Sequence, residues 1–472
     1  MISIAIVGGG VAGSTVALCL SQIGLDVTLF EKKPSLIDGP PFCHLHAGGN
    51  LYREISDEQC ITLLHQSIDF AKFYPYCVDH RPTVIALPTY DDGKPEDLLP
   101  RLEKLQKEYQ DLIDKDISNR VLSESADYYK LYYEEDIKIL QEKELKEKPK
   151  TLDDWMIPVA KNIDFSKVKF PLVIVQEYGL NLFKLASGVT LSLNEISNCT
   201  LHLNTEVSNI RKQSNSWEVE YIKDGIKTRK TYDYLINAAG FQSGTIDDML
   251  QLKRKRFVEF KAAYVTRWEN IDGLWPEVIF HGKRGTPNGM GQFTPYANGY
   301  IQLHGMTEDI TLFKNGLVKS CDVSSQPKLS EDFEIRLFKK WPDGEIEQRT
   351  QLAIDHISKF IPKFKNSKIS PKPLFGAQQI PGNDKDLRAF DVSFDDTNYA
   401  RCEIVKVSSV FTMVDSIMKD LVKNFHLGEK FVNIQWKNMI NIDLEKIENF
   451  SKTICKSRNY PEDLGDVNNP FG

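Results

Sequence analysis

The sequence predicts an α/β fold in which two or more packed units are built from one chain of 472 residues. Three observations predict this fold class. A short β-branched apolar run at residues 2–7 is followed at once by glycines and a helical pattern. Residues 200–237 and 257–305 each contain several short runs typical of β-strands, separated by turn residues. Residues 96–150 are rich in Lys, Glu and Asp with leucines at helical spacing, which predicts an inserted helical segment.

The N-terminal segment has the pattern of a strand–helix–strand unit. Residues 2–7 predict the first strand, residues 14–23 the helix, and residues 26–30 the second strand, which Glu31 closes. Between the first strand and the helix, residues 8–13 fit G-x-G-x-x-G. These parts occur in the required order within one unit, which favours a Rossmann-type dinucleotide-binding fold over a glycine-rich turn without a ligand.

Three glycines of this turn are each required for a different structural reason. Gly8 permits the tight turn, Gly10 lets a pyrophosphate approach the backbone, and Gly13 lets the helix pack closely on the strand. The helix N-terminus offers unpaired N–H groups to the phosphates, and Glu31 can accept hydrogen bonds from ribose hydroxyls. The residues predicted to bind the dinucleotide here are Gly8, Gly10, Val11, Ala12, Gly13, Glu31 and Lys32.

A second signature distinguishes FAD from NAD, which share the first one. Residues 200–210 alternate like a strand, and strands at 217–221 and 228–230 are joined by Asp224-Gly225, a hairpin turn. Residues 234–237 then lead into an N-A-A-G turn that ends at Gly240. This order resembles the flavoproteins of the D-amino-acid oxidase superfamily, within the glutathione-reductase-type FAD fold. The resemblance implies FAD as the cofactor.

The resemblance also implies an architecture and further cofactor contacts. It implies a Rossmann-type FAD-binding domain with a three-layer ββα arrangement, a mixed-sheet substrate domain and a helical insertion. In the family, the backbone at the position of Val207 lies against the adenine. The N-A-A-G turn, with Ala239 and Gly240, returns the chain to the sheet beside the cofactor.

A weaker block of resemblance lies near the C-terminus. Residues 402–407 predict a strand, and Ser408 and Ser409 can cap a helix that continues to Leu421. In the family, this helix directs its N-terminus at the flavin pyrimidine ring, which implies Ser408 and Ser409 as cofactor contacts. Serines replace the glycines usual at this turn, and an ordinary buried strand and helix is the alternative.

The loop after the second strand carries histidines where family members usually carry serine, arginine and asparagine. In the family this loop crosses the pyrophosphate and runs to the flavin ring. The resemblance implies cofactor contacts at His44, His46, Ala47 and Gly48. The two histidines either contact the flavin, bond to it covalently, or only hydrogen-bond the loop backbone.

The predicted domain organisation places the FAD-binding domain in three separate parts of the chain. These parts are residues 1–95, 171–250 and 396–472, with a helical insertion or lid at 96–170 and a substrate domain at 251–395. Strands at 257–268 and 277–281 and a hairpin at 291–305 resemble the substrate-domain sheet of the same superfamily.

The resemblance implies hydride transfer from a small amine, amino acid or hydroxy acid to flavin N5. An acid substrate needs a cation for its carboxylate, and an alcohol needs a base for its hydroxyl proton. The predicted catalytic residues are His281, His304, Arg267 and Arg388, with Arg284 and Arg53 as further candidates for the cation. A flavin monooxygenase or halogenase and a non-catalytic flavoprotein are the alternatives. The late G-D-A-A-H-like turn of the monooxygenases is not found in the sequence.

The composition limits the kinds of binding partner that we expect. The formal net charge is −7, with basic and acidic residues mixed, so a nucleic-acid surface is not expected. None of the eight cysteines forms a C-x-x-C pair, so we expect reduced thiols, no metal site and a cytoplasmic location. No apolar run has the length of a membrane-spanning helix. The expected partner is a small-molecule substrate, while peripheral membrane contact and oligomeric state stay open.

Overall fold

The computed structural model of the protein describes residues 2–39, 43–45, 55–432, 434–438 and 440–466. Within these residues the strands form a six-stranded sheet, a ten-stranded sheet and two three-stranded sheets. Helices lie between and around the sheets, so the predicted α/β class is confirmed.

The six-stranded sheet contains the predicted N-terminal strands. Its strands in spatial order are β21 (Val392–Asp396), β22 (Tyr399–Cys402), β13 (Tyr234–Asn237), β1 (Ser3–Val7), β2 (Asp26–Phe30) and β9 (Cys199–His202). The strands from β22 to β9 are parallel, and β21 pairs antiparallel with β22 at the edge. Ile4, Ala5 and Ile6 have no exposed surface, because both faces of a parallel sheet are covered.

A three-stranded antiparallel sheet covers one face of the six-stranded sheet. Its strands are β10 (Thr205–Gln213), β11 (Ser216–Lys223) and β12 (Ile226–Tyr232). Asp224 and Gly225 between the last two both have positive φ, 51° and 77°, as the predicted two-residue hairpin turn requires. Ala5 and Val7 of β1 pack against this sheet, in a cluster with Trp217.

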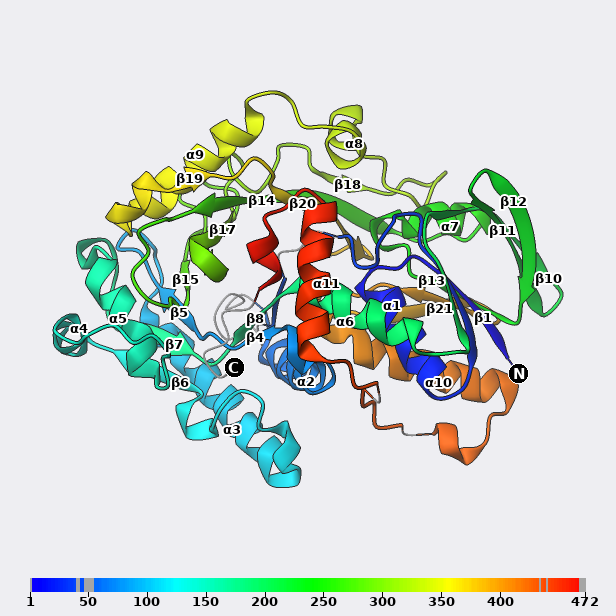
Figure 1. Ribbon diagram of the computed structural model, residues 1–472, viewed down its shortest axis with the longest axis horizontal. Coiled ribbons are helices and arrows are strands. Elements are labelled where there is room, and N and C mark those ends of the chain that lie inside the picture. The colour runs from blue at the N-terminus through cyan, green and yellow to red at the C-terminus, as the bar shows by residue number, and fades with distance from the viewer. Residues whose placement is uncertain (1, 40–42, 46–54, 433, 439, 467–472) are drawn as a thin grey trace.

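Helices cover the opposite face of the six-stranded sheet. They are α1 (Val11–Gln22), α6 (Leu182–Asn194) and α10 (Val410–Phe425), with α11 (Leu444–Ser457) packed on α6. Ile4 and Ile6 of β1 pack in the same cluster as Val16 and Met413 of these helices. Three-stranded sheet, parallel sheet and helices therefore form the predicted three-layer ββα arrangement, on the right of Figure 1.

The ten-stranded sheet is mixed, as predicted for the substrate side. Its strands are β5 (Thr83–Ala86), β6 (Tyr129–Tyr132), β7 (Leu172–Val175), β14 (Arg256–Arg267), β15 (Glu277–Phe280), β16 (Gly291–Pro295), β17 (Tyr300–Gly305), β18 (Leu317–Lys319), β19 (Lys368–Ile369) and β20 (Leu374–Pro381). Among the pairs in this sheet, β15 runs parallel to β5, and β14 runs antiparallel to β17 and β20. Three of its strands, β5, β6 and β7, come from the part of the chain before residue 176. The domain boundaries predicted from the sequence stay a prediction.

The remaining elements surround these sheets. The helices are α2 (Asp57–Phe73), α3 (Leu99–Lys115), α4 (Glu134–Gln141), α5 (Leu152–Asn162), α7 (Ser243–Met249), α8 (Glu331–Phe338) and α9 (Glu345–Ser358), and the last sheet contains β3 (Cys43–Leu45), β4 (Val78–Asp79) and β8 (Tyr178–Leu180). Three of these helices, α3 to α5, lie in the segment predicted as a helical insertion. Leu102, Leu105 and Tyr109 of the predicted α3 stripe are buried. Within the described residues, no helix combines the length and apolar character that crossing a bilayer requires.

For two strands, the residue range predicted from the sequence was wrong. The single strand predicted at 200–210 is two strands in different sheets, because Asn204 adopts a positive φ of 50° and turns the chain between them. The strand predicted at 402–407 is instead β22, which ends at Cys402. Glu403 leaves the sheet with its carboxylate 2.7 Å from Arg254, so the apolar run that follows it has no strand partner in the described sheets.

Burial of His356 on α9 makes the stability of the fold depend on pH. A Cβ at Gly291 would lie 2.8 Å from His356 Cδ2, so the imidazole packs tightly on β16. Burial lowers the pKa of His356 to about 4 from the ordinary 6.5. Between these pH values the unfolded chain binds a proton at this position and the folded chain does not. The free energy of unfolding therefore falls as the pH drops through this window.

We expect His356→Gln to lose less stability on acidification than the wild type. The difference should reach about 2 kcal/mol near the lower end of the window, since each pKa unit corresponds to about 1.4 kcal/mol. Urea denaturation at several pH values between 7 and 4.5 measures it. Identical pH profiles for the two proteins would contradict this role for His356.

Candidate active site

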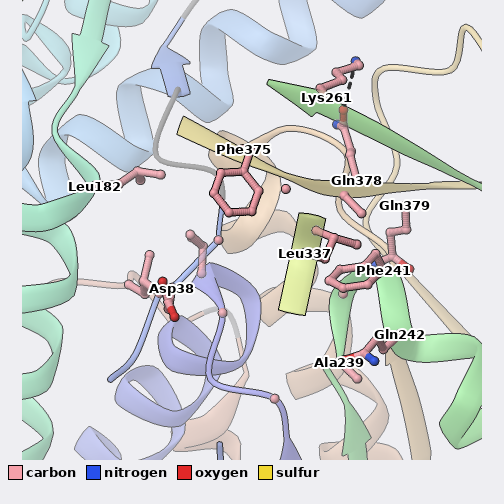
Figure 2. Close-up of a pocket in the computed structure, with 18 of the residues that line it drawn as sticks. Asp38, Leu182, Ala239, Phe241, Gln242, Lys261, Leu337, Phe375, Gln378 and Gln379 are labelled. Carbon is pink, nitrogen blue, oxygen red and sulfur yellow. Dashed lines mark hydrogen bonds between the residues drawn. The ribbon is translucent and has the colours of Figure 1, made fainter. Parts of the chain in front are cut away.

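A cavity of about 1000 Å³ lies between the glycine turn of the N-terminal unit and the ten-stranded sheet. At one end its wall is made by the ends of β1 and β2, the start of α1 and the N-A-A-G turn. At the other end its wall is made by side chains from β14, β16, β17 and β20. Figure 2 shows this arrangement, with Ala239 and Gln242 at one side and Lys261 and Gln378 at another.

The glycine turn has the backbone that a phosphate site needs. Gly8 has a φ of 105°, and a Cβ there would lie 2.4 Å from Ala238 O. A Cβ at Gly13 would lie 1.9 Å from Gly8 O, whereas a Cβ at Gly10 would meet no atom of the described residues within 4 Å. Gly10 is the N-cap of α1 and provides no side-chain cap, so the first N–H groups of the helix stay available beside the cavity. These features fit the pyrophosphate of a dinucleotide.

The other predicted nucleotide contacts mostly line the same cavity. Gly8, Gly10, Val11, Ala12, Glu31, Lys32, Val207, Ala239 and Gly240 are all part of its wall. Glu31 accepts hydrogen bonds from Gly9 N at 2.7 Å and Lys33 N at 2.8 Å. A carboxylate has about four acceptor positions, so Glu31 retains capacity for ribose hydroxyls.

Several predicted residues lie away from the cavity or beyond the described part of the chain. Gly13 lies behind the turn, and Ser408 and Ser409 are buried without lining the cavity, although the preceding Lys406 and Val407 do line it. The Ser409 hydroxyl donates to Gln66 Oε1 at 2.8 Å and does not cap α10. The predicted contacts of the His44 side chain, His46, Ala47, Gly48 and Arg53 lie outside the described residues.

The predicted catalytic residues separate into two groups. His281, His304 and Arg388 line the cavity, as does the further candidate Arg284. Arg267 does not line it and lies over the ring of Tyr300, with 5.4 Å between the guanidinium carbon and the ring centroid. The structure therefore brings both histidines and two arginines to one space.

Three cations surround one buried carboxylate at this end of the cavity. Glu259 Oε2 lies 2.8 Å from Lys261 Nζ, and Glu259 Oε1 pairs with Arg284. Burial acts to raise the pKa of Glu259, but the surrounding Lys261, Arg284 and Arg388 hold it below its ordinary value. Burial, followed by the nearby Arg284, lowers the pKa of Arg388. Lys261 and Arg284 therefore share one carboxylate, which leaves an excess of positive charge at this pair, whereas Arg388 has the carboxylate of Asp386 3.8 Å away.

Several residues of the cavity wall were not predicted from the sequence. They are Lys261, Lys372, Gln378, Gln379 and Arg458. Lys261 had a visible signal, because it interrupts an apolar strand pattern. Arg458 had none: it lies just after α11 and donates to Leu36 O at 2.7 Å and Ile37 O at 3.1 Å, which fixes the loop after β2 from the far end of the chain.

Comparison with known proteins identifies the nucleotide-binding part. The family model described as FAD dependent oxidoreductase matches residues 3–136. Residues 3–136 are therefore similar to an FAD-dependent oxidoreductase domain. The match confirms the predicted enzyme class and FAD as the cofactor. A search of the curated proteins finds no match to this chain.

Several solved structures share the fold over most of the chain. L-proline dehydrogenase from P. horikoshii is 14% identical, with a TM-score of 0.58 over 98% of this chain and 99% of its own. Glycine oxidase from Geobacillus kaustophilus is 12% identical, with a TM-score of 0.57 over 94% of this chain and 100% of its own. L-alpha-glycerophosphate oxidase from Mycoplasma pneumoniae, with FAD bound, is 16% identical, with a TM-score of 0.55 over 94% and 100%. At these identities the likeness establishes the fold.

Proposed function

We propose that the protein oxidises a small amino acid or hydroxy acid at a C–N or C–O bond. The observation that carries the proposal is that Lys261 and Arg284 share the single carboxylate of Glu259, with Arg388 nearby on the same cavity wall. Two cations that share one carboxylate leave a positive charge that a further anion stabilises, and an acid substrate brings one. The bound FAD supplies the two-electron acceptor for the oxidation.

The two arginines are proposed to hold the substrate carboxylate. Arg388 lines the cavity with 18% of its side chain exposed and donates to Leu387 O at 2.9 Å. Its nearest carboxylate, Asp386, is 3.8 Å away. A guanidinium in this setting can form two parallel hydrogen bonds to a substrate carboxylate, and this fixes the orientation of the carbon that is oxidised.

His281 and His304 are proposed to manage the substrate proton. His281 is 5% exposed and directly follows β15, His304 lies on β17, and both line the cavity. A neutral imidazole can accept the proton of an ammonium or hydroxyl group as the bond is oxidised. The solved structures with a similar fold include an L-proline dehydrogenase and a glycine oxidase, which supports a substrate of this class.

A panel of substrates under anaerobic conditions tests the proposal. The panel contains amino acids, 2-hydroxy acids, the corresponding amines and alcohols without a carboxylate, and sn-glycerol 3-phosphate. We expect the flavin absorption band to bleach with at least one acid and not with its uncharged analogue. Bleaching by none of the acids would contradict the proposal, and bleaching by the phosphate ester alone would reassign the anion site to phosphate.

Replacement of Arg388 tests the anion site directly. We expect Arg388→Ala to lower kcat/KM about 30-fold, mostly through KM, because hydrogen bonds to a charged group contribute about 2 kcal/mol. Arg388→Lys should recover part of the loss, since it restores the charge without the fork. Arg267→Ala is the matched control, because Arg267 lies outside the cavity wall. Equal steady-state constants for the Arg388→Ala and Arg267→Ala variants would remove Arg388 from the site.

A further inference from the structure

The segment between β18 and α9 leaves the ten-stranded sheet and packs on the N-A-A-G turn. Gln326 Nε2 donates to Phe241 O at 3.0 Å, and Thr245 N donates to Gln326 Oε1 at 3.1 Å. A Cβ at Gly244 would lie 2.4 Å from Ser325 O, so the two backbones are in close contact. The segment that carries α8 is therefore fixed to the part of the chain that borders the nucleotide.

The last residue of α8 lies at the nucleotide end of the cavity. The Phe338 ring lies 6.5 Å from the Phe241 ring, with 28° between their planes. Lys32 Nζ lies 5.4 Å from the centroid of Phe338 and also donates to Gln242 Oε1. All four residues line the cavity, and Figure 2 shows Phe241 and Gln242 there beside Leu337, the neighbour of Phe338 in α8.

Phe338 is exposed although the rest of its helix is anchored. Phe333 at the start of α8 is buried against Phe260, with 5.0 Å between ring centroids. Arg336 Nη2 lies 2.8 Å from Glu345 Oε2, and both side chains are less than one-fifth exposed. Phe338 itself is 53% exposed. A large apolar ring that a fixed helix holds at the edge of a cavity is available to a flat ligand surface.

We propose that Phe338 contacts the adenine of bound FAD, so that α8 adds a second wall to the adenosine site. The site is assigned to the adenosine end because Lys32 follows Glu31, the residue whose carboxylate fits the ribose hydroxyls. A base that packs against Phe338 covers apolar ring surface that now faces solvent. The glycine turn of the N-terminal unit and the substrate-side part of the chain then both bind the cofactor. The substrate-side part therefore contributes to FAD retention as well as to substrate binding.

The rate at which FAD leaves the holoenzyme tests this proposal. After dilution, released FAD is followed by its gain in fluorescence. We expect Phe338→Ala to release FAD about tenfold faster than the wild type, since base–aromatic stacking contributes at this level and such losses appear mainly in dissociation rates. Phe338→Trp should stay within twofold of the wild type. Phe394→Ala is the control, because Phe394 is 41% exposed on β21 and does not line the cavity.

Two further measurements separate a cofactor contact from a structural role. The melting temperature of the protein, followed by circular dichroism with excess FAD, should fall in Phe338→Ala only by what tenfold weaker FAD binding accounts for, about 1.4 kcal/mol, and Phe338→Trp should restore it. The visible flavin spectrum should be unchanged, because adenosine and not the flavin ring is contacted. Release at the wild-type rate, a lower melting temperature that tryptophan does not restore, or a shifted flavin spectrum would each overturn the proposal. None of these outcomes depends on the substrate, so the proposed reaction is tested separately.

Discussion

Gly10→Val is expected to fold normally and to be purified without flavin. Gly10 has φ −66° and ψ −175°, an extended conformation that valine adopts without strain. Among the described residues, no atom lies within 4 Å of a Cβ at this position. The new side chain would therefore occupy only the space beside the first N–H groups of α1, where the pyrophosphate is expected. We expect the Kd for FAD to rise at least about a hundredfold, a loss of about 3 kcal/mol.

Two other glycines provide the comparison. Gly428 also has an extended conformation, and no described residue lies within 4 Å of a Cβ there. It does not line the cavity, so Gly428→Val should keep its flavin. Gly13→Val should lose both flavin and stability, because its Cβ would lie 1.9 Å from Gly8 O. Flavin content per chain and thermal unfolding of the three variants measure both effects. A yellow Gly10→Val protein with normal FAD affinity would contradict the placement of the pyrophosphate.

The cofactor side of the site was predictable because its requirements are local. The glycine turn, the acid at the end of the second strand and the Asp224-Gly225 hairpin each depend on backbone conformations that a few neighbouring residues set. The sequence alone therefore predicts a tight turn at Gly8, close approach of a phosphate at Gly10 and a packing contact at Gly13. The space around a Cβ at each of these positions agrees with the predicted role. The split of residues 200–210 was missed because an asparagine at positive φ has no pattern of its own.

The substrate side was less predictable because its residues meet only through long-range folding. Arg267 and Lys261 lie on one strand, six residues apart, which corresponds to about 20 Å at about 3.3 Å per residue. Of the two, only Lys261 lines the cavity, and the interruption that it makes in the apolar pattern does not tell which part of the strand faces a ligand. Phe338 and Arg458 reach the cavity from separate helices, and their neighbours in the sequence give no indication of it. The sequence therefore predicted the type of ligand site better than the residues on its far wall.

Asp247→Ala is expected to destabilise the fold more than any other single replacement considered for this protein. Asp247 on α7 accepts hydrogen bonds from Arg401 Nε at 2.8 Å and from the Tyr399 hydroxyl at 2.8 Å, and it also pairs with Arg256. All four side chains are fully buried. Because Tyr399 and Arg401 belong to the six-stranded sheet and Arg256 to the ten-stranded sheet, this carboxylate joins the two walls of the cavity.

Removing the carboxylate would leave two buried guanidinium groups without their shared partner. The free energy of unfolding should then fall by about 3–5 kcal/mol, the range for breaking a buried ion pair by removing one side. The adjacent Asp248 is the matched control: it is exposed and bonds Ser325 N at 2.7 Å, so Asp248→Ala should cost about 1 kcal/mol or less. Urea unfolding of holoenzymes, followed by circular dichroism and by flavin fluorescence, measures both. If the two variants unfold at the same urea concentration, Asp395 and Glu403 are sufficient partners for the arginines, and Asp247 does not join the sheets. If Asp247→Ala releases its flavin before the chain unfolds, the carboxylate also holds the two walls of the cavity in position.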